Sequence, residues 1–199
     1  MKSKDTESGG DAYEALRRRL GAMERLEFLF FWLRWFYPKA RGVTWYVLLY
    51  CFLFQKVLRI NGRVPWPVHF TSRILYPKNI TVGDNSPVGL SGGGYVQARN
   101  GIIIGNNFRM GPGVGLISAN HDLDDYDRWA PTAPITIGDN VWIGMNTVVL
   151  PGVRIGDNVV VASNSCVNRD IPPNSIAGGA PCQVIKEKGP YQGKSYDNV

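Results

Sequence analysis

One β-branched residue recurs every six positions in the second half of the chain, and this spacing restricts the folds open to it. A half-buried strand alternates with a period of two, and an amphipathic helix has a period of 3.6. The observed series follows neither period, and a glycine directly follows several of its members. The series consists of Ile137, Ile143, Val149, Ile155, Val161 and Val167.

The same step continues upstream through Ile104, Met110 and Leu116, and further up through Val82 and Val88. A short strand and a sharp turn, repeated three times, close a triangular coil in which one apolar side chain per six points to the axis. Glycine and asparagine tolerate positive φ, so the "GDN" and "GNN" segments suit the corners. A single coil cannot bury its own core, and residues 80–179 supply about five coils of about eighteen residues. The pattern predicts a parallel β-helix.

Residues 117–129, "ISANHDLDDYDRW", interrupt the repeat, which resumes at 135–137. We therefore expect an excursion loop at about 118–134 that leaves one coil without ending the β-helix. It carries His121, one of two histidines in the chain. An imidazole with a pKa near ~6.5 can accept a proton from a hydroxyl group at neutral pH, which makes His121 a candidate general base. The alternative is a loop histidine that caps a turn.

The other polar residues of the loop allow two interpretations each. The acidic run Asp122, Asp124, Asp125 and Asp127 is either a solvated loop face or a source of groups that orient the imidazole or bind sugar hydroxyls, with Asp122 and Asp124 nearest. Trp129 either stacks on a sugar or anchors the loop. The second histidine, His69, precedes the repeat, and we interpret it as structural or close to a subunit interface.

Residues 1–65 form a separate N-terminal segment with a different composition. Two stretches rich in aromatic residues, 26–38 and 43–60, are separated by Pro38 and Gly42, which predicts two helices joined by a turn. The longest apolar run, 43–54, is shorter than the roughly 20 residues that span a bilayer. The segment is either a helical cap on the main domain or a neighbouring subunit, or a peripheral membrane contact through residues 26–60.

The net charge of +6 comes entirely from this front segment. Residues 1–63 hold 12 Lys/Arg and 6 Asp/Glu, whereas residues 64–199 hold 10 of each. This distribution argues against a nucleic-acid-binding surface on the main domain. The three cysteines lack metal-ligand spacing, and together with the lack of a secretory signal they favour reduced thiols in a cytosolic protein.

Three stretches of the sequence carry a resemblance to a known family. They are 120–144 ("NHDLDDYDRWAPTAPITIGDNVWIG"), 148–175 and 177–185 ("AGGAPCQVI"). In these stretches the chain resembles the hexapeptide-repeat acyltransferases, and within them the branch of maltose, galactoside and nodulation-factor O-acetyltransferases and their polysaccharide-modifying relatives. The resemblance implies an all-β, left-handed parallel β-helix at 66–179, a C-terminal tail at 180–199, and a homotrimer with active sites between subunits.

The resemblance also implies roles for individual residues. His121 would be the general base, the backbone N–H of Met145 would stabilise the oxyanion, and no metal would take part. Acetyl-CoA would be the co-substrate. Its binding residues would be Trp142, Gly144, Ala162, Ser163, Asn168, Arg169 and Lys186. The sugar acceptor would be bound by Asn120, Asp122, Asp124, Tyr95 and Trp129.

Two departures from the family pattern concern the ligands. Gln183 stands where relatives often have a basic residue, which weakens the contacts expected for the coenzyme A phosphates. Upstream, "GLSGGGYVQARNG" replaces the region where maltose and galactoside enzymes place an asparagine for their acceptor. This difference, which includes Tyr95, indicates a different and larger acceptor.

The expected function is acetyl-CoA-dependent O-acetylation of a sugar hydroxyl in a capsular, exopolysaccharide or lipid-linked glycan, in the cytoplasm or at the inner face of its membrane. The alternatives are another acyl-CoA donor, a small-molecule acceptor, or a non-catalytic scaffold. A γ-type carbonic anhydrase is excluded, because it binds zinc through three histidines, two of them closely spaced in one subunit. The two histidines of this chain, His69 and His121, are 52 residues apart.

Overall fold

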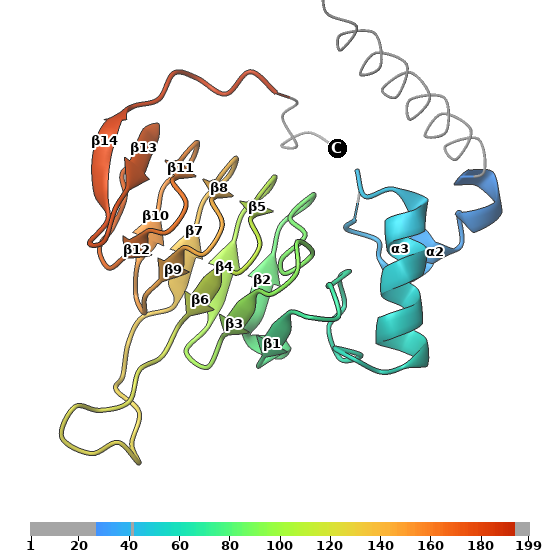
Figure 1. Ribbon diagram of the computed structural model, residues 1–199, viewed down its shortest axis with the longest axis horizontal. Coiled ribbons are helices and arrows are strands. Elements are labelled where there is room, and N and C mark those ends of the chain that lie inside the picture. The colour runs from blue at the N-terminus through green and yellow to red at the C-terminus, as the bar shows by residue number, and fades with distance from the viewer. Residues whose placement is uncertain (1–26, 41, 194–199) are drawn as a thin grey trace, which may run out of the picture.

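The computed structural model describes residues 27–40 and 42–193 of the chain. Figure 1 shows a stack of short strands with a small helical segment beside its first coil. The helical segment comprises the 3₁₀-helix η1 (Glu27–Phe30), the α-helix α2 (Leu33–Phe36), the α-helix α3 (Trp45–Phe52) and the π-helix η2 (Leu53–Val57). A second 3₁₀-helix, η3 (Pro77–Asn79), lies between the first two strands.

The strands of the described part build three sheets, one for each side of a triangular coil. The first sheet contains β1 (Arg73–Leu75), β3 (Tyr95–Gln97), β6 (Gly115–Ile117), β9 (Val148–Val149) and β12 (Cys166–Val167). The second contains β2 (Ile80–Val82), β4 (Ile102–Ile104), β7 (Ile135–Ile137) and β10 (Arg154–Ile155). The third contains β5 (Arg109–Met110), β8 (Trp142–Ile143), β11 (Val160–Val161), β13 (Ser175–Gly178) and β14 (Gln183–Glu187).

Successive coils pair in parallel, and only β13 and β14 pair antiparallel among these strands. The predicted parallel β-helix is therefore confirmed as an architecture of three parallel sheets. Trp142 pairs with Val160, which lies eighteen residues later in the sequence. Arg109 pairs with Trp142, which lies thirty-three residues later. The difference of fifteen residues is the excursion between β6 and β7, which extends away from the coils in Figure 1.

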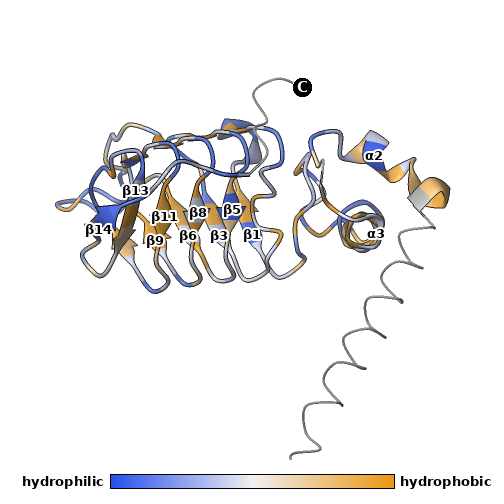
Figure 2. Ribbon diagram, turned by 90° about the horizontal axis from the view of Figure 1, so that it is seen from above, coloured by the Kyte–Doolittle hydropathy of each residue, from blue (hydrophilic) through white to orange (hydrophobic). Residues whose placement is uncertain are grey.

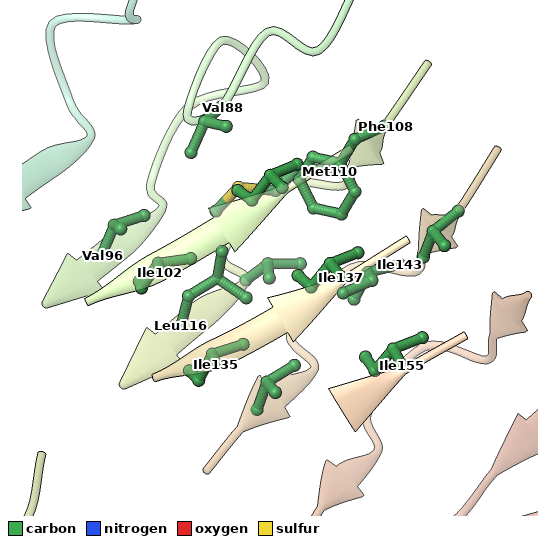
Figure 3. Close-up of a cluster of buried hydrophobic side chains, with 14 of the residues drawn as sticks. Val88, Val96, Ile102, Phe108, Met110, Leu116, Ile135, Ile137, Ile143 and Ile155 are labelled. Atoms are coloured by element: carbon green, nitrogen blue, oxygen red, sulfur yellow. The ribbon is translucent and has the colours of Figure 1, made fainter. Parts of the chain in front are cut away.

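The members of the six-residue series line the axis of the coils, as predicted, and each is at most 8% exposed. Their side chains form one continuous cluster, part of which Figure 3 shows. The expectation of one inward side chain per six residues is wrong, because each short strand also buries the residue two positions earlier. Examples of this second set are Ile135, Val141, Val153 and Val159, all at most 3% exposed.

Asparagine and glycine have different functions at the corners. Asn107, Asn140 and Asn158 adopt φ between 56° and 58°, the left-handed conformation that asparagine tolerates better than most residues. The preceding glycine is needed for a different reason. A Cβ on Gly138 would lie 2.9 Å from the backbone nitrogen of Asp157 on the next coil and would also meet its Oδ1. Glycine thus permits close stacking of the coils.

The N-terminal segment differs from the prediction of two regular helices. The stretch 26–38 forms η1 and the four-residue α2, since the bonds from Arg34 N to Phe31 O and from Trp35 N to Trp32 O span only three residues. The second helix forms, as α3 and η2. A small core of their inner residues holds the segment together; its members are Leu33, Tyr37, Ala40, Val43, Leu48 and Cys51.

Side-chain hydrogen bonds attach this segment to the first coil. Gln55, only 1% exposed, accepts bonds from Tyr37 Oη (3.1 Å) and from the backbone nitrogen of Val68 (3.0 Å). Lys39 Nζ donates to the carbonyl oxygen of Val82 at 2.9 Å. These bonds hold the helical segment against the first coil. In the described part of the chain, no helix has the length and apolar character needed to cross a membrane.

Candidate functional site

The excursion between β6 and β7 is a closed ribbon that presents His121 on the surface. His121 and Trp129 form an antiparallel bridge. On either side of it, Asp122 N donates to Arg128 O at 3.0 Å and Ala130 N donates to Asn120 O at 2.9 Å. The loop is thus two short antiparallel arms joined by a turn, and the imidazole is exposed at a fixed point on one arm.

Polar contacts to the coil below fix the base of the ribbon. Asn100 Nδ2 donates to Thr132 Oγ1 at 2.7 Å, and Thr132 Oγ1 donates to the carbonyl oxygen of Ser118 at 3.0 Å. Ser118, which is fully buried, accepts a bond at its Oγ from Asn100 N. Both arms are therefore anchored to one asparagine of the neighbouring coil.

Ring contacts hold the imidazole of His121. It stacks on the indole of Trp129, with centroids 4.2 Å apart and planes inclined by 29°. The guanidinium of Arg99 lies 4.4 Å from the centroid of the same indole. Among the described residues, no group hydrogen-bonds to either imidazole nitrogen. These contacts correspond to the anchoring interpretation of Trp129. The sequence offered no signal for Arg99.

The acidic run stabilises the turn of the ribbon. Asp122 Oδ1 accepts a bond from Asp124 N at 2.9 Å, and Asp125 Oδ1 accepts one from Asp127 N at 3.0 Å. Asp125 also forms an ion pair with Arg128 at 2.9 Å. None of these carboxylates contacts the imidazole in the described structure. Asp122 therefore shapes the loop, and Asp124 points its exposed side chain to solvent.

Met145 lies at the corner between the third and the first sheet, and its backbone N–H has no hydrogen-bond partner among residues 27–40 and 42–193. Glycine at 111 leaves room for it, because a Cβ there would lie 2.7 Å from Met145 N. One coil further, Gly144 makes the same allowance for Ser163, whose backbone nitrogen would lie 2.6 Å from a Cβ on that glycine. The backbone N–H of Ser163 is also unpaired in the described chain.

Ala162 differs from these two residues, because its backbone is used within the coil. Its N–H donates to Ala177 O at 2.8 Å. Its carbonyl oxygen accepts bonds from Thr147 Oγ1 (2.9 Å) and Ser165 Oγ (2.7 Å). Ala162 can thus offer a ligand its methyl group but no free backbone donor. Met145 and Ser163 are thus two exposed residues of this corner whose backbone N–H is unpaired in the described chain.

A pocket of about 420 Å³ lies against the third sheet, and its lining includes Trp142 and Gly111. Gly111 also packs closely against Met145 N, although Met145 itself does not line the pocket. The sequence predicted Trp142, whose side chain is 56% exposed, but not the other lining residues. The strand register would have identified Arg109 as a lining residue, because Arg109 pairs with Trp142 and occupies the same outward position one coil earlier. The remaining lining residues are Pro87, Leu90, Ser91 and Met110.

The predicted residues fall on different corners of one chain. His121, Asn168 and Arg169 follow strands of the first sheet, at its corner with the second. Gly144, Met145, Ala162 and Ser163 lie at the corner between the third sheet and the first. A single copy therefore does not bring His121 to Met145. Three further predicted positions are exposed on strands: Tyr95 on β3, and Gln183 and Lys186 on β14.

His69 belongs to a half-buried aromatic cluster and not to the loop site. Its Nε2 lies 3.1 Å from Tyr50 Oη, its Nδ1 lies 2.7 Å from Thr71 Oγ1, and its ring stacks on Phe70. The cluster joins the helical segment to the first coil, which agrees with a structural role. No group of three or more His, Cys, Asp or Glu side chains is gathered for a metal ion in the described residues.

Comparisons with known proteins agree on one family. A family model described as "Bacterial transferase hexapeptide (six repeats)" matches residues 134–169. The galactoside O-acetyltransferase of Escherichia coli K12 is 39% identical over 130 residues, or 64% of this chain and 61% of that protein. A putative acetyltransferase of Saccharomyces cerevisiae is 42% identical over 120 residues, or 56% of this chain and 58% of that protein.

A solved structure of a galactoside acetyltransferase in complex with coenzyme A is 34% identical. The match covers 63% of this chain and 68% of that chain, with a TM-score of 0.51. The two curated relatives are matched over less than two thirds of their own length, at 61% and 58%.

Proposed function

The chain belongs to the hexapeptide-repeat acetyltransferases, and on this basis we propose that it transfers an acetyl group from acetyl-CoA to a hydroxyl group of a sugar. The observation that carries the proposal is a pair of groups suited to acyl transfer. One is the accessible imidazole of His121 on a braced loop. The other is the backbone N–H of Met145, which has no hydrogen-bond partner in the described chain.

The reaction assigned to these groups proceeds without an acyl-enzyme. A nitrogen of His121 removes the proton from the acceptor hydroxyl while its oxygen attacks the thioester carbonyl carbon. The carbonyl oxygen becomes negatively charged, and the N–H of Met145 donates a hydrogen bond to it. Collapse of this intermediate forms the ester, breaks the carbon–sulfur bond and releases the coenzyme A thiolate, which takes the proton from the imidazolium.

The proposal includes a left-handed coil and a homotrimer. More than one copy is needed because a single copy holds His121 and Met145 on different corners of the coil. Two copies that pack corner against corner would combine His121 of one with Met145 of the next. The same contact would form the coenzyme A groove. Trp142, Gly144, Ala162 and Ser163 would border it on one side and Asn168 and Arg169 on the other, with Lys186 near the phosphates.

The proposed acceptor is a sugar within a capsular, exopolysaccharide or lipid-linked glycan. Asn120, Asp122 and Asp124 lie on the loop beside the imidazole, where their polar groups can bind sugar hydroxyls. Tyr95 extends from β3 with 40% of its side chain exposed, so its ring is available to stack on a sugar of an extended acceptor.

The test compares the full-length chain with His121→Ala, with acetyl-CoA as donor. Candidate acceptors are galactosides, maltose, polymeric glycans and lipid-linked glycans, and the readouts are release of the coenzyme A thiol and acetyl ester on the sugar. We expect His121→Ala to lower turnover by about 10²–10⁴-fold, the usual contribution of a general base. Leu123→Ala, at an 88% exposed position in the same loop, is the matched control. Undiminished transfer by His121→Ala would overturn the proposal.

A further inference from the structure

The N-terminal helical segment leaves a large apolar surface uncovered on its outer side. Trp35 is 90% exposed and Phe31 is 70% exposed. Soluble proteins seldom expose many large apolar side chains in one short segment unless that surface binds a partner. Figure 2 colours much of this segment as hydrophobic. Its exposed apolar residues are Phe28, Leu29, Phe31, Trp35, Phe36, Tyr46, Leu53, Val57, Leu58 and Ile60.

The fold of the segment depends on other side chains. Leu33 and Leu48, two of the residues that build its small core, are at most 1% exposed. Gln55 ties the segment to the first coil through the hydrogen bonds to Tyr37 and Val68. Trp35 and Phe31 therefore remain exposed although the segment already has a core and an attachment, which indicates that they serve an external contact.

The charged residues that follow Glu27 in this segment have a single sign. The 56 residues between Glu27 and Asp84 contain no aspartate or glutamate. In the described part of this stretch, Lys39, Arg59 and Arg63 have exposed side chains, and Lys56 lies 5.7 Å from the centroid of the Tyr37 ring. The basic residues of the stretch are Arg34, Lys39, Arg41, Lys56, Arg59, Arg63, Arg73 and Lys78; Arg41 lies outside the described residues.

We propose that this outer face docks on the surface of a lipid bilayer that contains anionic lipids. Tryptophan, tyrosine and phenylalanine partition into the boundary between headgroups and acyl chains, while lysine and arginine attract anionic headgroups. The charged residues between Phe28 and Gly83 are all basic, which complements the negative charge of an anionic lipid surface. The helices α3 and η2 together span only Trp45–Val57, so the segment lies on the bilayer and does not cross it.

This inference goes beyond the proposed acetyl transfer and does not depend on it. Figure 1 shows the helical segment beside β1, at the opposite end of the coil stack from β13 and β14. A bilayer beneath the segment would therefore contact the first coil end. The loop with His121 leaves the stack between β6 and β7 and would stay accessible.

The full-length chain is mixed with vesicles of phosphatidylcholine alone or of phosphatidylcholine with phosphatidylglycerol, and bound protein is separated by flotation. We expect binding to the anionic vesicles, weak binding to the neutral ones, and loss of binding as the salt concentration rises. Phe31→Ser with Trp35→Ser should abolish flotation. Arg59→Gln with Arg63→Gln should weaken it about fivefold for each charge removed.

The matched control is Leu123→Ser with Tyr126→Ser, which removes two apolar side chains that are 88% and 74% exposed on the excursion loop. This variant should float like the unchanged chain, and circular dichroism verifies that every variant is folded. If the unchanged chain stays in the soluble fraction with anionic vesicles, the proposal fails. It also fails if Phe31→Ser with Trp35→Ser alters the oligomeric state in light scattering while vesicle binding persists, because the face would then contact a second copy.

Discussion

The indole of Trp129 stacks on the imidazole of His121, with ring centroids 4.2 Å apart, and the guanidinium of Arg99 contacts the same indole. In this arrangement an aromatic ring, and not a carboxylate, fixes the plane of the proposed general base. The strongest determinant of the imidazole position is therefore a neighbour eight residues away on the opposite arm of the ribbon. This relationship leads to the first prediction.

Trp129→Leu should lower the turnover of acetyl transfer about ten- to a hundredfold, because the imidazole loses its stacking partner and the reacting groups are misplaced. The KM for acetyl-CoA should change little, since Trp129 lies on the loop and not among the residues assigned to the coenzyme. Steady-state kinetics with the best acceptor of the screen measure both constants.

Trp129→Phe is the control for this prediction, because a phenyl ring can still stack on the imidazole and should retain most of the turnover. The prediction is wrong if Trp129→Leu and Trp129→Phe reduce turnover equally. It is also wrong if the main effect of Trp129→Leu is on the KM of acetyl-CoA.

Deletion of residues 119–133 should leave a folded protein without acetyl transfer activity. The deletion removes fifteen residues, the length by which this coil exceeds the coil that follows it, and joins Ser118 to Pro134. The shortened coil would then have the eighteen-residue spacing of that following coil. Circular dichroism and thermal melting measure the fold, and release of the coenzyme A thiol measures activity.

The control for the deletion is removal of residues 118–133, one residue more, which breaks the register of the following strand. This second variant should melt at a clearly lower temperature, because a shift of one residue turns the inward side chains outward. If both deletions melt alike, the excursion is not the independent insertion that the strand register indicates.

The six-residue series was sufficient to predict three parallel sheets, because one buried position per short strand fixes both the strand and its phase. The series did not predict that the residue two positions before each of its members is also buried. Residues such as Val141 and Val159 have their own six-residue spacing, but the first series alone already accounted for a continuous core. Two inward residues separated by one outward residue form the shortest strand with a buried face, which explains why both positions are filled.

The candidate site was predictable only in part. The break in the repeat located His121, and the resemblance located Met145 and implied a site between subunits, but neither showed which corner of the coil each residue occupies. The corner that a residue occupies depends on which of the three sheets its preceding strand joins, and this assignment requires the structure. The contacts of Arg99 and Asn100 with the loop were also out of reach, because they join residues 30 and 32 positions apart without a motif at either end.

Gly138→Ala should destabilise the fold by about 1–3 kcal/mol, the usual cost of overpacking a tight contact. Its Cβ would lie 2.9 Å from Asp157 N and would meet Asp157 Oδ1, which accepts a hydrogen bond from Asp139 N. Urea denaturation measures the free energy of unfolding. Gly189→Ala is the matched control, because a Cβ at Gly189 meets nothing within 4 Å and should change stability little. Equal stability of the two variants would contradict the proposed close stacking of the coils.

The thiol of Cys51 should make the helical segment less stable at high pH. Burial raises its pKa from 9.0 to about 12, although a hydrogen bond with the backbone of Val68 acts in the opposite direction. Above about pH 9 the unfolded chain loses a proton that the folded chain keeps, so stability is fully present below that pH and falls as the pH rises toward 12.

Thermal melting between pH 8 and pH 10.5 should show a steeper loss of stability for the unchanged chain than for Cys51→Ala. Burial also raises the pKa of Tyr37, so a part of the loss should persist in Cys51→Ala. A second measurement uses a thiol reagent at pH 8.5, where the folded chain should label at Cys51 far more slowly than the chain in urea. Labelling at equal rates, or identical pH profiles for the two proteins, would show that the thiol is not shielded as the structure indicates.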